Sequence, residues 1–425
     1  MTGTTARAQD TALSLPNAIR LLLGLLYLRL ISGAAAALGL PDGARFVTLA
    51  LAGAAALVFL ADPRIARPTA LALMGFALWL IACALSVTFG SALPLPDLAA
   101  TQMVLLVLYG AMLNGLALHL RGPAGVAAVR RFLAVFILTG AALAFHQAAS
   151  GTGFAEAGRS TYLRAFGPDV HPVSFGLQLV VALAGLEIAR LRSGARLGAG
   201  MVALYLLGGA ALYLSFARTA WVVLLLVVLL TVWSRSRPAL RLALMPPLAG
   251  AGIVLALASG RFDDLTSLSF FLEHYDFSAS TYDFRYVDNS LSWRIANWSM
   301  GLRLALEQPL TGQGPGQAAA VSAFGLQMHN LFLEALVEVG ALGLIAVVLV
   351  VAGLGRMRHH VPGGCANGRA VRGLVGGLGL GLLPTITLST SLVGQTMTVL
   401  LLALVFVLAI APTAPDPSKG TTDAG

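Results

Sequence analysis

The sequence predicts an all-α polytopic membrane protein with about twelve transmembrane helices. Its composition is the first reason, because 58% of the 425 residues are hydrophobic and only 11% are charged, whereas soluble proteins carry roughly 25% charged residues. Long uncharged stretches are the second, since a helix needs about 20 apolar residues to cross a hydrocarbon core of about 30 Å. These stretches do not alternate as outer-membrane β-strands do. We therefore expect one membrane domain, residues 1-425, and no separate soluble domain.

The uncharged stretches place the spans. Nothing is charged between Arg67 and Asp97, and the stretch between Arg372 and Asp416 is long enough for two spans. The expected spans are residues 17-39, 45-61, 69-90, 98-119, 126-149, 172-189, 197-214, 217-234, 240-259, 329-354, 372-392 and 395-412. No Ala-x-Ala cleavage pattern follows the first span, so we expect a retained anchor. The tail 412-425 is rich in Thr, Pro, Asp and Gly, and we expect it to be disordered.

The distribution of Lys and Arg predicts the orientation, because these residues collect in short cytoplasmic loops. With the N-terminus inside, seventeen of the 27 Lys and Arg residues fall in inside segments and eight in outside segments. We therefore expect a bacterial inner-membrane protein with both termini in the cytoplasm. The net charge of +9 reflects this inside bias and calls for no nucleic-acid partner.

Residues 260-328 form one long outside segment, and long loops are where function concentrates. Its second half predicts an amphipathic helix lying along the interface. The apolar side of that helix is expected to carry Trp293, Ala296, Met300 and Leu304, with Arg294, Asn297 and Arg303 elsewhere around it. Pro309 ends the helix, and the glycine-rich TGQGPGQ turn then leads to His329.

Several ionisable residues cluster near the outside ends of the predicted spans. They are Arg159, Arg164, His171, Arg218, Arg294 and His329. Convergence of arginines suits an anionic ligand such as a diphosphate, because the planar guanidinium binds two phosphate oxygens at once. A neutral imidazole can accept a proton from an attacking hydroxyl near pH 7. These residues therefore predict a site for a phosphorylated ligand at the outside face.

Simpler structural roles stand beside these. A single arginine at a helix end often extends to lipid headgroups, and His329 on its own could cap its helix. Trp293 and Trp298 have the character of interfacial anchors as well as sugar-stacking platforms. Glu338 lies inside a predicted span, where an acid is costly and points to function or to a buried partner. We expect it to pair with Arg20 or Arg29 of the first span.

Five motifs occur in a fixed order along the chain. They are RAFGPDVHP at 164-172, SFARTAW at 215-221, SWRIANW at 292-298, PLTGQGPG at 309-316 and HNLFLEALVEVGALG at 329-343. As an ordered set, they resemble the O-antigen ligase and Wzy-type polysaccharide polymerase superfamily. The resemblance covers residues 150-360, and the upstream spans match only in hydropathy.

The resemblance implies a GT-C-like fold of about twelve helices and a glycosyltransferase that works without a metal or cofactor. Such an enzyme moves a glycan from undecaprenyl diphosphate to an acceptor hydroxyl on the periplasmic side, with inversion at the anomeric carbon. Matching positions imply that Arg164, Arg218 and Arg294 bind the donor diphosphate and that His329 activates or orients the acceptor. Possible supporting residues are His171, Asn330, Glu338 and Arg159. Ala217 departs from the pattern, because the family usually has Ser there.

The resemblance leaves the acceptor open. A ligase of lipopolysaccharide biosynthesis uses lipid A-core, whereas a polymerase of O-antigen or exopolysaccharide uses a second lipid-linked glycan; membrane lipids surround either enzyme. A transporter or flippase of lipid-linked sugars is the alternative of another class. It would place charges midway through the membrane on broken helices, whereas most of the candidate residues lie at the outside edge of the predicted spans.

Overall fold

The computed structural model describes most of the chain. The described residues are 16–90, 93–154, 163–169, 171–236, 261–277, 290–322, 327–362, 367–388 and 395–412, with a few isolated positions between them. Within them the structure is helical, and the β-structure there is a single bridge between Phe154 and Arg164. The expected all-α fold is therefore confirmed for this part of the chain. The predicted tail 412-425 lies outside it, except for its first residue.

Eleven of the twelve predicted spans coincide with helices. These are α2 (Asn17–Ala37), α3 (Ala44–Ala61), α4 (Ala70–Phe89), α5 (Pro96–His119), α6 (Gly122–Ser150), α7 (Pro172–Arg192), α8 (Ala199–Ser215), α9 (Arg218–Arg235), α14 (Leu331–Arg356), α15 (Gly368–Leu388) and α16 (Thr396–Ile410). Most of the remaining predicted span, 240-259, lies outside the described residues. Nine of the described helices are long and apolar enough to cross a membrane, and α8 and α16 are shorter apolar helices. The chain is a polytopic membrane protein.

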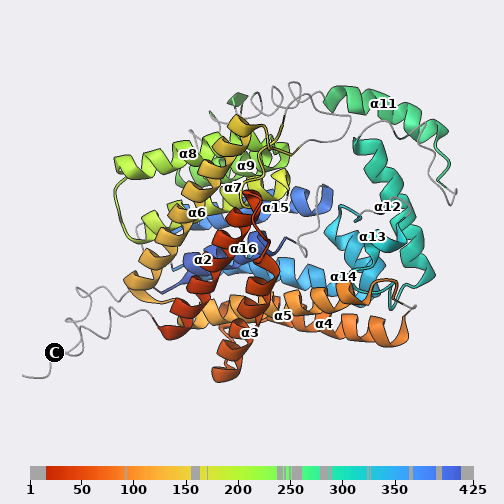
Figure 1. Cartoon of the computed structure of the whole chain (residues 1–425), viewed down its shortest axis with the longest axis horizontal. Coiled ribbons are helices and arrows are strands. Elements are labelled where there is room, and N and C mark those ends of the chain that lie inside the picture. The colour runs from red at the N-terminus through yellow and green to blue at the C-terminus, as the bar shows by residue number, and fades with distance from the viewer. Residues whose placement is uncertain are drawn as a thin grey trace, which may run out of the picture.

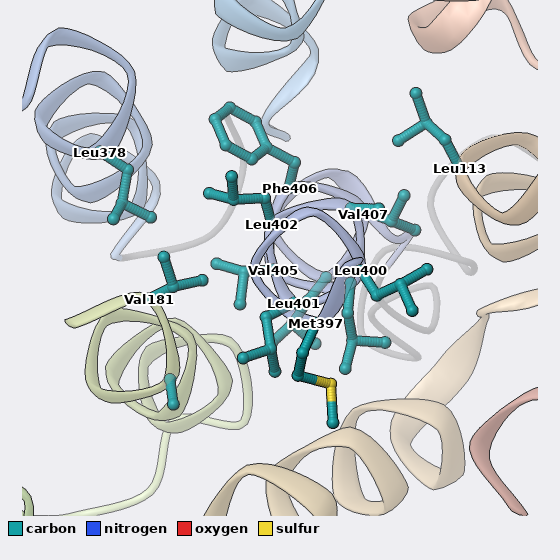
Figure 2. Close-up of a cluster of buried hydrophobic side chains, with 14 of the residues drawn as sticks. Leu113, Val181, Leu378, Met397, Leu400, Leu401, Leu402, Val405, Phe406 and Val407 are labelled. Carbon is teal, nitrogen blue, oxygen red and sulfur yellow. The ribbon is translucent and has the colours of Figure 1, made fainter. Parts of the chain in front are cut away.

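The centre of the bundle is α16. Its residues from Leu400 to Ala409 are almost completely buried, as expected of a helix that is apolar on all sides. Figure 2 shows α16 end-on, with Val181 of α7, Leu378 of α15 and Leu113 of α5 approaching from different directions. Because α16 is covered by other helices rather than by lipid, its short length needs no match to the full bilayer thickness.

Peripheral helices expose apolar side chains. Leu57 and Leu60 of α3 are 66% and 73% exposed, and Phe89 of α4 is 71% exposed. On a soluble protein so much exposed apolar surface would mark a binding site or a risk of aggregation. On helices of this length it is the surface that the hydrocarbon core covers.

Glycines let neighbouring helices approach closely. In a membrane this close packing drives helix association, because lipid tails are as apolar as the helices and the hydrophobic effect does not favour contact between them. On α15, Gly373, Gly377 and Gly381 recur every fourth residue and lie directly against α9. A Cβ atom at Gly377 would come within 2.7 Å of Val227 Cα on α9. Gly353 of α14 makes a similar backbone approach to Ala72 of α4.

The segment 260-328 contains α11 (Arg261–His274), α12 (Ser290–Glu307) and α13 (Ala318–Val321). Figure 1 shows α11 and α12 at one side of the bundle, where α12 packs against α14. The predicted helix in the second half is thus present, but its buried side differs from the expectation. Ala296 is buried as predicted, Asn297 is buried against expectation, and Leu302 and Leu306 are exposed. Polar partners at the bundle, described below, account for the burial of Asn297.

Candidate functional site

Arg164 is fixed to the turn between α8 and α9. Its segment pairs with Phe154 and docks through a hydrogen bond from the Ala165 N–H to the Leu214 carbonyl, 2.9 Å long. The Arg164 guanidinium donates to the carbonyl oxygens of Ser215, through Nε at 3.2 Å, and Phe216, through Nη2 at 3.4 Å. These carbonyls end α8, where a cation is favoured by the helix dipole. Arg164 therefore holds this turn in place, a role that the sequence did not predict.

The segment around Gly167 is also held by α6. The side-chain oxygen of the buried Gln147 accepts from the N–H groups of Phe166 and Gly167, both at 3.0 Å. Gly167 has a φ of +55°, and a Cβ there would collide with the ring of Phe175. Only glycine combines this backbone conformation with this packing. The RAFGPD sequence therefore forms a fixed shelf at the ends of α6, α7 and α8.

Asp169 ties the same shelf to the bundle core. Gln178 of α7 donates to Asp169 and to Thr398 of α16. Arg29 of α2 interacts electrostatically with Asp169, and its Nε donates to Thr48 at 3.2 Å. Arg29 thus serves the shelf at Asp169, and the predicted pairing of Arg29 with Glu338 is wrong.

Arg218 is the first residue of α9 and is exposed. The turn before it is tight: Phe216 has a φ of +48°, and Ser215 Oγ accepts from the Ala217 N–H at 3.2 Å. Ala217 is completely buried. A Cβ added at Gly176 of α7 would come within 2.6 Å of the Ala217 Cβ. Ser215 therefore makes the local polar contact at this turn, and the close approach of Gly176 favours the small Ala217. Arg164 thus binds the carbonyls of the turn that leads directly to Arg218.

His171 is the N-cap of α7. Its Nδ1 accepts from the Val173 N–H at 3.2 Å, and its ring packs edge-on against Phe154 at 5.3 Å. An N-cap acceptor satisfies one of the donors that begin a helix, and Pro172 at the first helical position favours this start. The geometry therefore assigns His171 a structural part beside the arginines.

His329 lies just before α14 and contacts α12. The rings of His329 and Trp293 meet edge to face, with centroids 4.9 Å apart. His329 has a φ of +52°, a left-handed conformation that is uncommon for residues other than glycine. Strained backbone of this kind persists where the surrounding structure fixes it, and it is found most often at functional sites.

The two residues before His329 are hydrogen-bonded to α12 through their backbone carbonyls. Trp298 Nε1 donates to the Met328 carbonyl at 2.8 Å, and Asn297 Nδ2 donates to the Gln327 carbonyl at 3.1 Å. Asn297 Oδ1 also accepts from Ser322 at 3.0 Å. Trp298 and Asn297 thus fix the backbone that presents His329. Arg294 follows Trp293 directly on α12 and is half-buried.

Asn330 starts α14. Its Oδ1 accepts from the N–H groups of Phe332 and Leu333, both at 3.1 Å. Glu334 is buried in the first turn of the helix, where a carboxylate is favoured by the helix dipole. Asn330 is therefore an N-cap that orients α14 directly behind His329. An Asn before an apolar run is a signal for this role that the sequence already carried.

The helix α14 is interrupted at Val339 and Gly340, and Gly340 has a φ of +71°. The TGQGPG loop fills the interruption. Its backbone N–H groups at Gln313 and Gly314 donate to the carbonyls of Val337, at 2.7 Å, and Glu338, at 2.9 Å. Irregular backbone at membrane depth is tolerated where it is buried in protein, and this loop satisfies that condition.

Glu338 lies directly before the interruption of α14. Its carboxylate accepts from Gln102 Nε2 of α5 at 2.9 Å and from the Ala318 N–H at 3.3 Å, and only 4% of the residue is exposed. The predicted ion pair with Arg20 or Arg29 is therefore wrong, because side-chain and backbone donors supply the partners instead. Glu338 joins α5, α13 and α14, and its part in a reaction would be to position α14.

The N-termini of α9 and α14 lie at one end of the bundle. The glycines of α15 show that it runs antiparallel to α9, because Gly373 meets Ser234 and Gly381 meets Val223. The short connection 357–367 makes α14 and α15 antiparallel too. Arg218 and His329 therefore share the end of the bundle at which α15 finishes. Arg164 contacts the turn before Arg218, and Trp293 contacts His329. The helix α15 packs against both α9 and α14.

Arg159 lies outside the described residues. Within the described part, no group of three or more His, Cys, Asp or Glu side chains is arranged to hold a metal ion. Gln147, Trp298 and Asn297 are positioning residues that the sequence did not identify. Their partners are backbone groups, which leave no pattern in a sequence.

Comparison with known proteins gives one family. Residues 203–348 match the family described as O-Antigen ligase, a stretch that runs from α8 to α14 and includes Arg218, Arg294 and His329. None of the curated proteins compared with the chain matches it. The matched stretch contains four of the five motifs completely, and the motif at 164-172 lies before it. The chain is a polytopic membrane protein, and its segment 203–348 is similar to the O-antigen ligase family.

Proposed function

We propose that the protein is a glycosyltransferase of the O-antigen ligase type, which moves a glycan from undecaprenyl diphosphate to an acceptor hydroxyl. The observation that carries the proposal is the placement of Arg218 and His329 at one end of a membrane bundle, each at the start of a helix in the matched stretch. Helix N-termini favour anions, so the start of α9 adds to the Arg218 charge. A GT-C-like arrangement of helices is part of the same proposal.

Each residue has a chemical part in this reaction. Arg218 and Arg294 bind the donor diphosphate and stabilise the charge that develops as it leaves. His329 takes the proton of the acceptor hydroxyl while its oxygen attacks the anomeric carbon. The bond from that carbon to the diphosphate breaks, and undecaprenyl diphosphate departs with the electron pair. Attack opposite to the leaving group inverts the anomeric centre, and no metal takes part.

Arg164 serves as a positioning residue in this scheme. Its guanidinium holds the carbonyls that precede Arg218, so it fixes where the α9 N-terminus points. The interruption in α14 does not favour a transporter, because the TGQGPG loop and Glu338 fill it with satisfied hydrogen bonds. The active face lies on the periplasmic side in this proposal, which follows from the bias of Lys and Arg.

The test compares two site variants with two matched controls. His329→Ala and Arg218→Ala are compared with His274→Ala and Arg45→Ala, which remove an exposed His and an exposed Arg elsewhere. After membrane insertion is confirmed, glycan transfer is followed on gels in cells that lack their own enzyme. We expect losses of about 100-fold or more for His329→Ala and about 10- to 100-fold for Arg218→Ala. Normal transfer by both site variants would exclude the proposal.

The products also identify the acceptor. Accumulation of unligated, full-length lipid-linked polymer in the His329→Ala strain supports a ligase that uses lipid A-core. Accumulation of single-repeat products supports a polymerase that uses a second lipid-linked glycan.

A further inference from the structure

A groove lies between α14, α15 and α16, at the end of α14 opposite to His329. It has a volume of about 430 Å³, within the usual range for a ligand site. Its walls are mostly apolar, with Leu354 of α14, Leu380 and Leu383 of α15, and Leu402 and Phe406 of α16. Figure 2 shows Leu402 and Phe406 leaving the same side of α16. The residues proposed for glycan transfer, Arg164, Arg218, Arg294 and His329, do not line it.

Glycines, which have no side chain, form part of the groove wall. Gly355 of α14 and Gly376 and Gly379 of α15 line it, and a Cβ atom at any of the three would meet nothing within 4 Å. The glycines that pack α15 against α9 are different ones, at 373, 377 and 381. The two sets follow different faces of α15, so one face supports helix packing and the other opens the groove.

The mouth of the groove is cationic. Arg356 and Arg358 line it and are exposed, and His359 is beside them, accepting from Arg358 Nε at 3.2 Å. No Asp or Glu is among the lining residues. The two guanidinium charges exceed the opposing partial charge of about half a unit at the C-terminus of α14. The mouth therefore attracts an anion, while the walls attract hydrocarbon.

The groove is long enough for an acyl chain. Its lining on α15 extends from Val375 to Ile386, or about 16 Å at a rise of 1.5 Å per residue. A phospholipid with its phosphate at the arginines and one acyl chain along Gly376 and Gly379 would match both the charge of the mouth and the apolar walls.

We propose that this groove is a binding site for an anionic phospholipid of the leaflet opposite to the catalytic face. Basic pockets between transmembrane helices bind anionic headgroups in this way. The site goes beyond glycan transfer, since its cationic mouth lies at the end of α14 opposite to His329. Its occupancy would brace α14, whose far end carries His329, against α15.

The experiment uses the full-length protein in detergent and native mass spectrometry, titrated with phosphatidylglycerol or with phosphatidylcholine. We expect roughly tenfold tighter binding of phosphatidylglycerol. Arg356→Gln and Arg358→Gln should each weaken it about fivefold, which corresponds to about 1 kcal/mol per cation. Arg121→Gln, at an exposed Arg before α6 that does not line the groove, is the control and should bind normally.

Filling the groove tests the walls. Gly379→Leu should abolish the preference for phosphatidylglycerol without lowering the melting temperature in lipid-free detergent, because its Cβ has open space. The matched control is Gly24→Leu on α2, where a Cβ also has open space. Equal binding of both lipids, or unchanged binding by Gly379→Leu, would overturn the proposal. So would tighter binding of undecaprenyl phosphate, or a rise in lipid binding on removal of residues 413–425, which would make that segment the occupant.

Discussion

The residues around His329 show how backbone geometry and chemistry are combined at one position. Asn330 caps α14 directly after it, and Trp298 holds the Met328 carbonyl directly before it. Between these two anchors the backbone of His329 is forced into the left-handed region, with a φ of +52°. The left-handed region costs a residue with a side chain about 1 kcal/mol or more, and Asn, Asp and His occupy it more often than other residue types. The proposed function gives this histidine a role that depends on its imidazole and not on backbone stability.

This gives a prediction that separates chemistry from folding. His329→Asn keeps a residue type that tolerates the left-handed region, so its melting temperature in detergent should equal or exceed that of the native protein. Glycan transfer should nevertheless fall by about 100-fold or more, because the proton acceptor is lost. Melting curves and transfer rates of the same preparations check this. A stable His329→Asn protein with native activity would exclude His329 as the base.

Several site residues could be predicted from the sequence, and others could not. Arg218 and His329 stand at the ends of uncharged stretches, so their place at helix starts followed from hydropathy. The partners of Arg164 and Trp298 are backbone carbonyls, which every residue possesses and no sequence reveals. Asn297 was expected to face outward because it is polar, yet Gln327 and Ser322 satisfy it inside. Glu338 was matched to an arginine by charge alone, while its partners are amides.

At the scale of elements, the predicted spans agree with the helices because about 20 uncharged residues permit little else in a membrane. The interruption of α14 was not predicted, since glycine is common in transmembrane helices and the loop that fills the gap comes from a distant part of the fold. The helix α11 was not identified either. Its Phe271 and Tyr275 are buried against α12 only in the folded protein.

The packing of α15 against α9 supports a prediction with a control on the same helix. Gly377→Ala would place a Cβ within 2.7 Å of Val227 Cα, whereas Gly376→Ala would meet nothing within 4 Å. We expect Gly377→Ala to lower the melting temperature by several degrees, because α9 must shift outward and loses close contacts. Gly376→Ala should be neutral or slightly stabilising. The two variants differ by one position, so equal melting temperatures would argue against this helix contact.

At the scale of the whole molecule, the two ends of the bundle have different characters. One end has Arg164 and Arg218 at the shelf that Gln147 and Asp169 hold, and His329 beside α12. The other end has the cationic mouth of the groove beside Arg356 and Arg358. Figure 1 shows α11 and α12 beside the bundle, on one side of it. The proposed function therefore depends on the orientation in the membrane, because a flipped lipid carrier presents its diphosphate on one side.

The orientation yields the last prediction. In a protein with Cys83 and Cys365 replaced by alanine, Leu272→Cys on α11 and His360→Cys beyond α14 each introduce one exposed thiol. The bias of Lys and Arg places Leu272 outside and His360 inside. A membrane-impermeant maleimide should therefore label Leu272→Cys in right-side-out vesicles and His360→Cys only in inverted vesicles. The reverse pattern would put His329 and Arg218 on the cytoplasmic side, where a flipped donor is absent, and the glycan-transfer proposal would fail even if both residues proved essential.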